Sequence, residues 1–327
     1  MVTYKKISEV AEVSASTVSK ALSGSGEIAP ATAEKIRKIA CELGYYKDKR
    51  ELKRNYSGSF APHIAIICPE IISVFYSSLA ESLIDKITVS GGRATVLITR
   101  FGKGEAESIA DSVAHDPDFD GIISLTNLMN YSTLNLPLVF MADVYLDDAD
   151  MIYCDISKGI SSLVDYLLSS GHTRIGFIGE MHTVYKEEIF RGCMLSRGFK
   201  VMDELIVRSY KRFFNVGREA YGVYREREVL PDAVICAYDE IAFGFMSEAE
   251  RNGIKIPEDI SVVGINNTPF AEVSSPPLTS LYSWREEMAH KAYDIIVSRI
   301  LGSTMPYQKL SYESSVVIRE SVQERKI

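Results

Sequence analysis

Apolar residues recur at helical spacing through the first part of the chain and predict three short amphipathic helices. The apolar positions are Ile7, Val10 and Ala11 in the first helix, Val18, Ala21 and Leu22 in the second, and Ala33, Ile36, Ile39, Ala40 and Leu43 in the third. Ser14 stands directly before the second helix, residues 15–22, where its hydroxyl can cap the helix. Pro30 suits the first turn of the third helix, and Gly44 suits its end. Helices this short must share one core, so we expect a small all-α domain over residues 1–46.

From residue 63 onward, the pattern changes to short, β-rich apolar runs that alternate with amphipathic segments. The predicted strands are residues 64–68, 94–98, 121–124, 138–141, 175–178, 233–236 and 261–265, and helical patterns such as 161–168 and 242–251 lie between them. Nearly continuous apolar strands joined by helices are typical of parallel sheets that helices cover on both faces. Because these strands are too many for one sheet, we expect an α/β domain of two lobes, with a ligand cleft at the carboxyl ends of the strands.

Charge is unevenly distributed along the chain, whose formal net charge is −8. Residues 1–56 contain 11 Lys and Arg against 7 Asp and Glu, whereas the remainder contains 25 against 37. A small basic module, which suits nucleic acid, therefore precedes a large acidic one. Residues 47–60 are highly charged and end in Ser and Gly, the composition of an exposed linker. We expect a helical domain over 1–46, a hinge over 47–61 and an α/β domain over 62–327.

Several protein classes find no support in the sequence. The cysteines, at positions 41, 68, 154, 193 and 236, form no Cys-x-x-Cys pair, and the histidines form no metal-binding pattern. We therefore expect reduced thiols, no metal and no cofactor. The absence of a nucleophile elbow or a nucleotide-binding glycine motif argues against an enzyme. No signal peptide or membrane-spanning apolar run is present, so we expect a soluble, cytoplasmic protein.

The order of residues in the first helices is more specific than their periodicity. Residues 10–24, VAEVSASTVSKALSG, closely resemble the DNA-binding head of the lactose/galactose repressor (LacI/GalR) family, as do Ala31-Thr32, Lys35-Ile36 and residues 42–45. The resemblance implies a helix-turn-helix whose second helix enters the major groove. The DNA contacts that it implies are Ala15, Ser16 and Lys20 on bases, Ser14, Thr17 and Ser19 on phosphates, and additionally Thr3 and Tyr45. A lysine can donate to guanine O6 and N7, and hydroxyls can reach phosphates or base edges.

Two positions in the head and hinge depart from the family pattern. Glu12 stands where the family usually has glycine, so either the turn differs locally or Glu12 adopts a left-handed conformation at some cost. In the hinge, the resemblance implies a helix whose leucine wedges into the minor groove, and Leu52 is the candidate. Lys47 replaces the family's proline before that helix, and a plain tether is the alternative.

The resemblance continues through the α/β domain and covers nearly the whole chain. Its landmarks are Pro69-Glu70, Phe75-Tyr76, and residues 120–123, 171–179, 231–233, 256–264, 275–279 and 319–321. It implies a periplasmic-binding-protein-like core of two lobes, with chain crossovers near residues 156, 283 and 314, one of them shaped by Pro276-Pro277. The effector positions that it implies are Phe75, Tyr76, Asp143, Ile189, Phe213, Tyr238, Asp239 and Asn266.

Three of these effector positions depart from the family. Tyr238 stands where the family usually has Asn, Ile189 where many members have a ligand-clamping Arg, and Asn266 where Asp is frequent. Arg191 is the neighbouring guanidinium that could replace the missing one. Alternatives remain open for the others: the aromatic side chains could pack in the core, Phe214 could serve in place of Phe213, and Asp239 could cap a helix.

Together these features predict a homodimeric transcriptional regulator, most simply a repressor of carbohydrate uptake or catabolism genes. It would bind a pseudo-palindromic operator in double-stranded DNA and respond to an effector, a sugar or sugar derivative, bound between the lobes. We expect no membrane partner. One alternative is a solute-binding protein of a transporter, which would require export and no DNA-binding head. The other is an α/β enzyme with an accessory helical domain, which a turnover screen would reveal.

Overall fold

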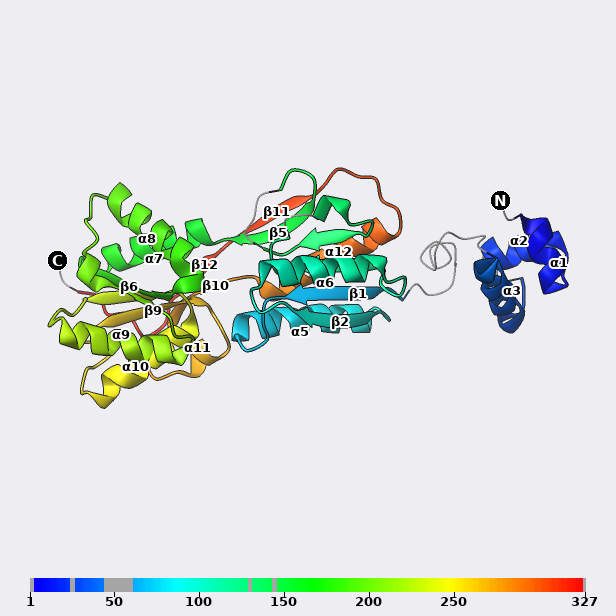
Figure 1. Cartoon of the computed structure of the whole chain (residues 1–327). Helices are drawn as coiled ribbons and strands as arrows, with labels where there is room; N and C mark the ends of the chain where they lie inside the picture. Colours follow the sequence, from blue (N-terminus) through cyan, green and yellow to red (C-terminus); the bar gives the residue numbers. More distant parts are fainter. Residues whose placement is uncertain (1–2, 24–26, 44–60, 129–130, 143–145, 326–327) are drawn as a thin grey trace. The chain divides into compact units, whose positions relative to one another are not determined.

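The computed structural model describes residues 3–23, 27–43, 61–128, 131–142 and 146–325 (Figure 1). The amino-terminal helices are α1 (Tyr4–Ala11), α2 (Ala15–Ser23) and α3 (Pro30–Glu42), as predicted. They share a core in which Ile7, Val18 and Ile36 are at most 1% exposed. Val10 was expected in this core but is 46% exposed. Ile7 and Ala11, four residues apart, already form the buried stripe of this two-turn helix, so Val10 falls outside it.

Beyond the head, the chain folds into two compact units. The first contains residues 76–153 and 285–310 together with the segment up to Ile72, and the second contains residues 73–75, 154–284 and 311–327. The chain therefore passes from one unit to the other at residues 153–154, 284–285 and 310–311. Pro276 and Pro277 lie within the second unit, in the loop before β10 (Thr279–Tyr282), so their interpretation as a crossover was wrong.

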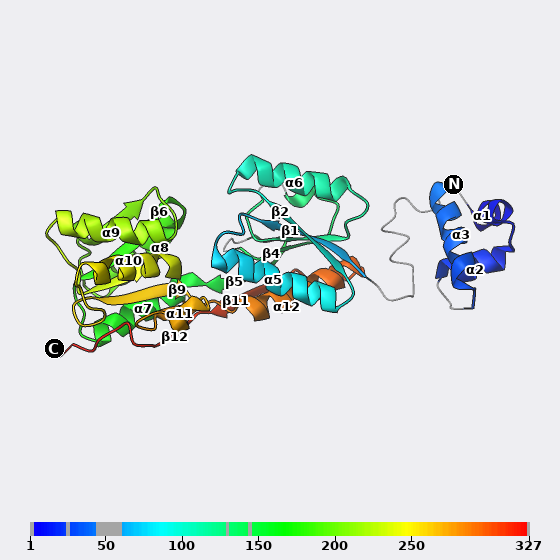
Figure 2. The same ribbon diagram turned by 90° about the horizontal axis from the view of Figure 1, so that it is seen from below.

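The first unit is built on a sheet with the strand order β11-β5-β4-β3-β1-β2. Its strands are β1 (His63–Cys68), β2 (Arg93–Ile98), β3 (Gly121–Ser124), β4 (Leu138–Phe140), β5 (Asp150–Asp155) and β11 (Lys309–Glu313). Helix α6 (Lys103–His115) covers one face, and α5 (Val74–Val89) and α12 (Arg285–Ile300) cover the other (Figure 2). Strands β1 to β5 run parallel, which is why β3 can be buried along its whole length and β1 from Ile64 onward.

The second unit repeats this plan with the strand order β12-β10-β9-β8-β6-β7. Besides β10, its strands are β6 (Ile175–Glu180), β7 (Ile206–Ser209), β8 (Ala233–Cys236), β9 (Ser261–Asn266) and β12 (Ser315–Val317). Helices α7 (Ile156–Ser169) and α8 (Val184–Ser196) lie on one face, and α9 (Phe214–Glu226) and α10 (Asp239–Arg251) on the other, with the short α11 (Phe270–Val273) after β9. Gly217 lets α9 touch α10, because a Cβ there would lie 2.0 Å from the carbonyl oxygen of Ile241.

The predicted fold class is confirmed: a helix-turn-helix head is followed in the chain by two mostly parallel sheets that helices cover. The predicted strands all occur, but β5, β7, β10, β11 and β12 were not predicted. These are short or partly exposed, so they lack the continuous apolar run of a central strand. Strand β12 runs antiparallel to β10, which departs from the expected all-parallel arrangement.

The carboxyl-terminal segment is part of the second unit's structure. Ser321 is buried; its Oγ donates to the carbonyl of Val262 (2.6 Å) and accepts from the N–H of Thr279 (2.8 Å). The N–H of Arg325 donates to the carbonyl of Ser170 (2.8 Å). Gly171, which follows Ser170, has a φ of +85°, and a Cβ there would lie 2.4 Å from the carbonyl oxygen of Arg325. Among the described helices, none has both the length and the apolar character needed to cross a bilayer.

Candidate functional site

The start of the candidate recognition helix α2 is fixed by a serine cap. The N–H of Thr17 donates to Ser14 Oγ (3.1 Å), as predicted, and the same oxygen lies 2.7 Å from Ser16 Oγ and 2.8 Å from Thr17 Oγ1. The Ser14 hydroxyl thus satisfies the N–H of Thr17, one of the backbone donors that a helix start otherwise leaves without partners. It also brings three of the predicted DNA-contacting side chains to one end of α2.

The two sides of α2 differ in polarity. Val18, Ala21 and Leu22 are at most 4% exposed and face the core of the head. The predicted DNA contacts lie on the other side: Ser14, Ala15, Ser16 and Lys20 are exposed, and Thr17 and Ser19 are half-buried. A helix held by one apolar side presents its short polar side chains outward, as a major-groove reader requires. Thr3, also exposed, is the N-cap residue of α1, whereas Tyr45 and Leu52 lie outside the described residues.

The turn between α1 and α2 contains the residue that departs from the family pattern. Glu12 has φ 58° and ψ 40°, a left-handed conformation, and the N–H of Val13 donates to the carbonyl of Ser8 (3.1 Å). Of the two alternatives for Glu12, the left-handed one is therefore confirmed. The turn keeps the geometry that glycine favours although a glutamate occupies it.

A polar and aromatic cluster lies at the carboxyl ends of β6, β7 and β8 in the second unit. The N–H of Phe213 donates to the hydroxyl of Tyr238 (3.0 Å), and the two rings meet edge to face at 6.0 Å. The guanidinium of Arg212 lies 4.6 Å from the centre of the Phe213 ring. Phe213 itself has φ 58° and ψ −137°, a strained backbone conformation that these contacts hold in place. The structure therefore brings two predicted effector residues, Phe213 and Tyr238, into one cluster.

An ion pair between the buried Glu180 and the half-buried Arg212 completes this cluster and was not predicted. Arg212 Nε lies 3.1 Å from both carboxylate oxygens of Glu180, whose side chain is 2% exposed. Burial and the neighbouring Glu180 both raise the pKa of the Tyr238 hydroxyl. Lys186, also buried, donates to the carbonyl of Ala237 (2.8 Å) at the same sheet edge. A signal for Glu180 was available, because this acidic residue lies two positions after the end of the predicted strand 175–178. Arg212 follows β7, which was itself missed.

Asp239 points into the protein. Its side chain is completely buried, and it accepts hydrogen bonds from the N–H of Thr268 and the hydroxyl of Ser280, both at 2.6 Å. Burial raises the pKa of Asp239 to about 6 despite these hydrogen bonds. The alternative that Asp239 caps α10 was wrong, because Tyr238 is the N-cap residue. Its contacts instead tie the start of α10 to the loop after β9 and to β10.

The remaining effector candidates occupy varied positions. Asn266 ends β9, is 8% exposed and has φ 104°, a region that asparagine tolerates better than most residues. Tyr76 meets Phe101 edge to face at 6.2 Å, and both it and Phe75 are half-buried in the first turn of α5. Ile189 is partly buried on α8 and packs against the core of the second unit. Asp143 lies outside the described residues.

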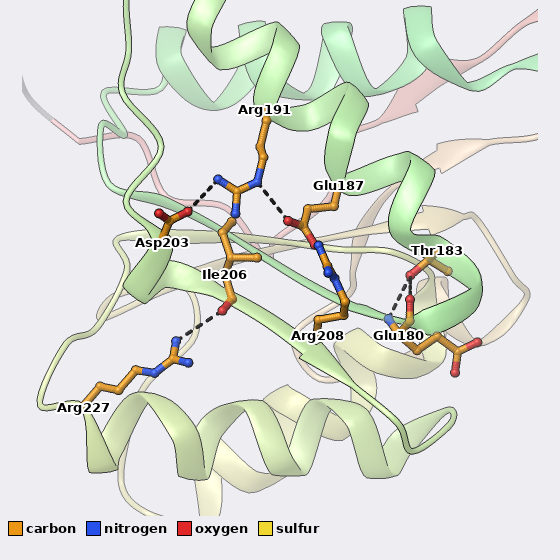
Figure 3. Close-up of polar contacts among 8 residues, drawn as sticks. All are labelled: Glu180, Thr183, Glu187, Arg191, Asp203, Ile206, Arg208 and Arg227. Atoms are coloured by element: carbon orange, nitrogen blue, oxygen red, sulfur yellow. Dashed lines mark hydrogen bonds and ion pairs between the residues drawn. The ribbon is translucent and has the colours of Figure 1, made fainter.

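Arg191, the neighbouring guanidinium, is held by two carboxylates. Its guanidinium binds Glu187 (2.9 Å) and Asp203 (2.8 Å), and Arg208 binds the same Glu187 (2.9 Å), as Figure 3 shows. This network runs from α8 to the 3-10 turn Asp203–Leu205, which precedes the edge strand β7, and to Arg208 within β7. The guanidinium found at the strand ends is that of Arg212.

Comparison with known proteins identifies the family. The sequence profile described as "Bacterial regulatory proteins, lacI family" matches residues 3–48, and that of a "Periplasmic binding protein-like domain" matches residues 164–322. The HTH-type transcriptional repressor CytR of Escherichia coli K12 is 26% identical over 333 residues, covering 98% of this chain and 96% of CytR. The chain belongs to the LacI family.

Solved structures share the architecture of this LacI-family regulator. A complex of the transcriptional regulator CelR with cellobiose matches with a TM-score of 0.70 at 23% identity, over 98% of this chain and all of that one. The lac repressor dimer bound to operator and the anti-inducer ONPF matches with a TM-score of 0.74 at 18% identity, over 98% and 99% of the two chains. The LacI-family regulator thus combines a DNA-binding head with a periplasmic-binding-like core and regulates transcription.

Proposed function

We propose that this regulator represses transcription as a homodimer, with α2 of each head in the major groove of one half of a pseudo-palindromic operator. The observation that carries the proposal is the serine-capped α2, whose apolar side is buried and whose polar side is exposed. In the proposed roles, Ala15, Ser16 and Lys20 face base edges, while Ser14, Thr17 and Ser19 hold phosphates. Two-fold symmetry of a homodimer matches that of the operator.

The proposed effector is a sugar or sugar derivative that contacts the strand ends of the second unit. Phe213 and Tyr238 offer aromatic surface, and Glu180, Arg212 and Asn266 offer acceptors and donors suited to hydroxyl groups. The cellobiose complex of the similar CelR supports this ligand class. An effector changes DNA binding only to the extent that its affinity differs between the DNA-competent and incompetent states.

We further propose that the protein is not an enzyme, acts in the cytoplasm and controls carbohydrate genes. The relatives named above are transcriptional regulators, and DNA in the cell is the proposed target. In the proposed division of roles, residues 1–46 read DNA, 47–61 form the hinge, and 62–327 bind the effector and dimerise.

Genomic footprinting of the full-length protein in its host tests this function, with the Lys20→Ala variant beside it. We expect discrete sites with two-fold symmetry near transport or catabolic genes. In titrations on one such site, Lys20→Ala should cost about 1–3 kcal/mol at one base pair, because guanine O6 and N7 would lose the ammonium group that donates to them. Occupancy that does not differ from that of random duplex, with or without metabolite extract, would overturn the proposal.

A further inference from the structure

A second charged residue accompanies the candidate base reader in the head. Lys20 Nζ lies 2.5 Å from Glu27 Oε2, and the two side chains are 48% and 60% exposed. Glu27 belongs to the segment that leads from α2 to α3 and was not part of the recognition motif considered above. If Lys20 reaches base edges, the Glu27 carboxylate is carried to the same part of the groove.

An acidic group at this place needs a hydrogen-bond donor on the DNA. An ionised carboxylate only accepts hydrogen bonds, and the phosphates of both strands repel it. Cytosine N4 is a donor in the major groove, and glutamate accepts from it, whereas lysine donates to guanine O6 and N7. An exposed ion pair contributes little to stability, so Lys20 and Glu27 can exchange their mutual contact for these base contacts at small cost.

We propose that Glu27 is a specificity-determining residue that reads a cytosine next to Lys20. With Lys20 on a guanine, the Glu27 carboxylate accepts a hydrogen bond from the N4 amine of a cytosine in the same or the adjoining base pair. This inference rests on the proposed function, since it requires α2 to enter the major groove.

Selection of binding sites from random duplex by the full-length protein tests the proposal. Wild type and Glu27→Ala are then titrated on the selected site and on its single-base variants. Glu9→Ala is the matched control, because Glu9 is an exposed glutamate of the same head that pairs with a lysine, Lys6, at 3.8 Å on α1. Thermal unfolding of each variant checks that the heads are equally folded.

The expected result is a loss of base discrimination that is confined to one position of the DNA site. Glu27→Ala should lose roughly 5- to 150-fold of discrimination at a cytosine beside the base pair that Lys20 reads. Glu9→Ala should keep it. Glu27→Gln should additionally admit adenine at this position, because glutamine pairs with adenine N6 and N7.

Two other outcomes are distinguishable. Uniformly tighter binding of Glu27→Ala to all sequences, with unchanged preference, would overturn the inference and make Glu27 an electrostatic brake on DNA binding. Failure of the wild type to select any sequence would instead overturn the proposed function itself.

Discussion

Glu12 occupies a backbone conformation that costs an L-residue energy. Its φ of 58° lies in the left-handed region, which is about 1–2 kcal/mol less favourable than the right-handed one for residues with a Cβ. Glu12→Gly should therefore stabilise the head, by roughly 0.5–1 kcal/mol, because the greater freedom of glycine in the unfolded chain offsets part of the gain. Slower amide hydrogen exchange throughout α1 and α2 would show this gain in stability.

The control for this change lies one turn earlier. Glu9→Gly falls inside α1, where glycine costs about 1 kcal/mol relative to good helix formers, so exchange should become faster. Equal acceleration by both substitutions would show that the turn does not depend on its left-handed residue.

Asp239 gives the second unit a dependence on pH. Burial raises its pKa to about 6, above the value of 3.8 expected in an unfolded chain. The folded state therefore holds the proton more tightly, and the associated stability is present in full below about pH 4 and lost as the pH rises through about 6. The loss is on the order of 3 kcal/mol, since one pKa unit corresponds to about 1.4 kcal/mol.

Asp239→Asn should remove this dependence and leave the packing intact. The asparagine oxygen can accept from the N–H of Thr268, and its amide can donate to the hydroxyl of Ser280, which is able to accept. Urea unfolding of both proteins from pH 4 to pH 7.5 should give a stability difference that increasingly favours the variant toward neutral pH. Parallel curves would contradict the assignment to Asp239.

Among the elements, the edge strand β7 is protected by arginines. Arg227 Nη1 donates to the carbonyls of Glu204 (2.8 Å) and Ile206 (3.2 Å), as Figure 3 shows for Ile206, so the edge carbonyl of β7 is covered. Arg208, in the middle of the strand, places a second positive charge there. Uncovered edges pair with other chains, and charges at an edge oppose this pairing.

Arg227→Ala should increase self-association of the protein with a loss of stability of only about 1 kcal/mol. Light scattering during prolonged incubation near the unfolding transition measures this self-association. Arg225→Ala is the control, because Arg225 lies in the last turn of α9 but binds Asn252 (3.0 Å) instead of the strand edge. If both variants aggregate at the same rate, edge protection by Arg227 is refuted.

The sequence predicted the elements well where burial is continuous and poorly where it is not. Strand β8 is apolar along its length and β1 is apolar from Ile64 onward, whereas β7 is interrupted by the exposed Arg208. In the candidate site, residues directly after predicted strands could be found from local order alone. The pairing of Glu180 with Arg212 could not, because the two residues are 32 positions apart and meet only when β6 and β7 align. The inward direction of Asp239 likewise depends on Ser280, which lies on another strand.

At the scale of the whole molecule, the order of domains followed from patterning and charge, since a helical basic segment and an acidic α/β segment differ in both. The hydrophobic pattern could not show where the chain returns to a unit that it has already left. Residues 285–310 complete the first unit and residues 311–327 complete the second, so each unit includes sequence from widely separated parts of the chain. Such long-range completion leaves no local signal.

That return has a genetic consequence. Ser321 and Arg325 form hydrogen bonds with Val262 in β9, Thr279 in β10 and Ser170 at the end of α7, the first helix of the second unit. A frameshift that replaces residues 319–325 would therefore behave as a null allele, and a reporter or purification tag inserted before Arg319 would not be tolerated.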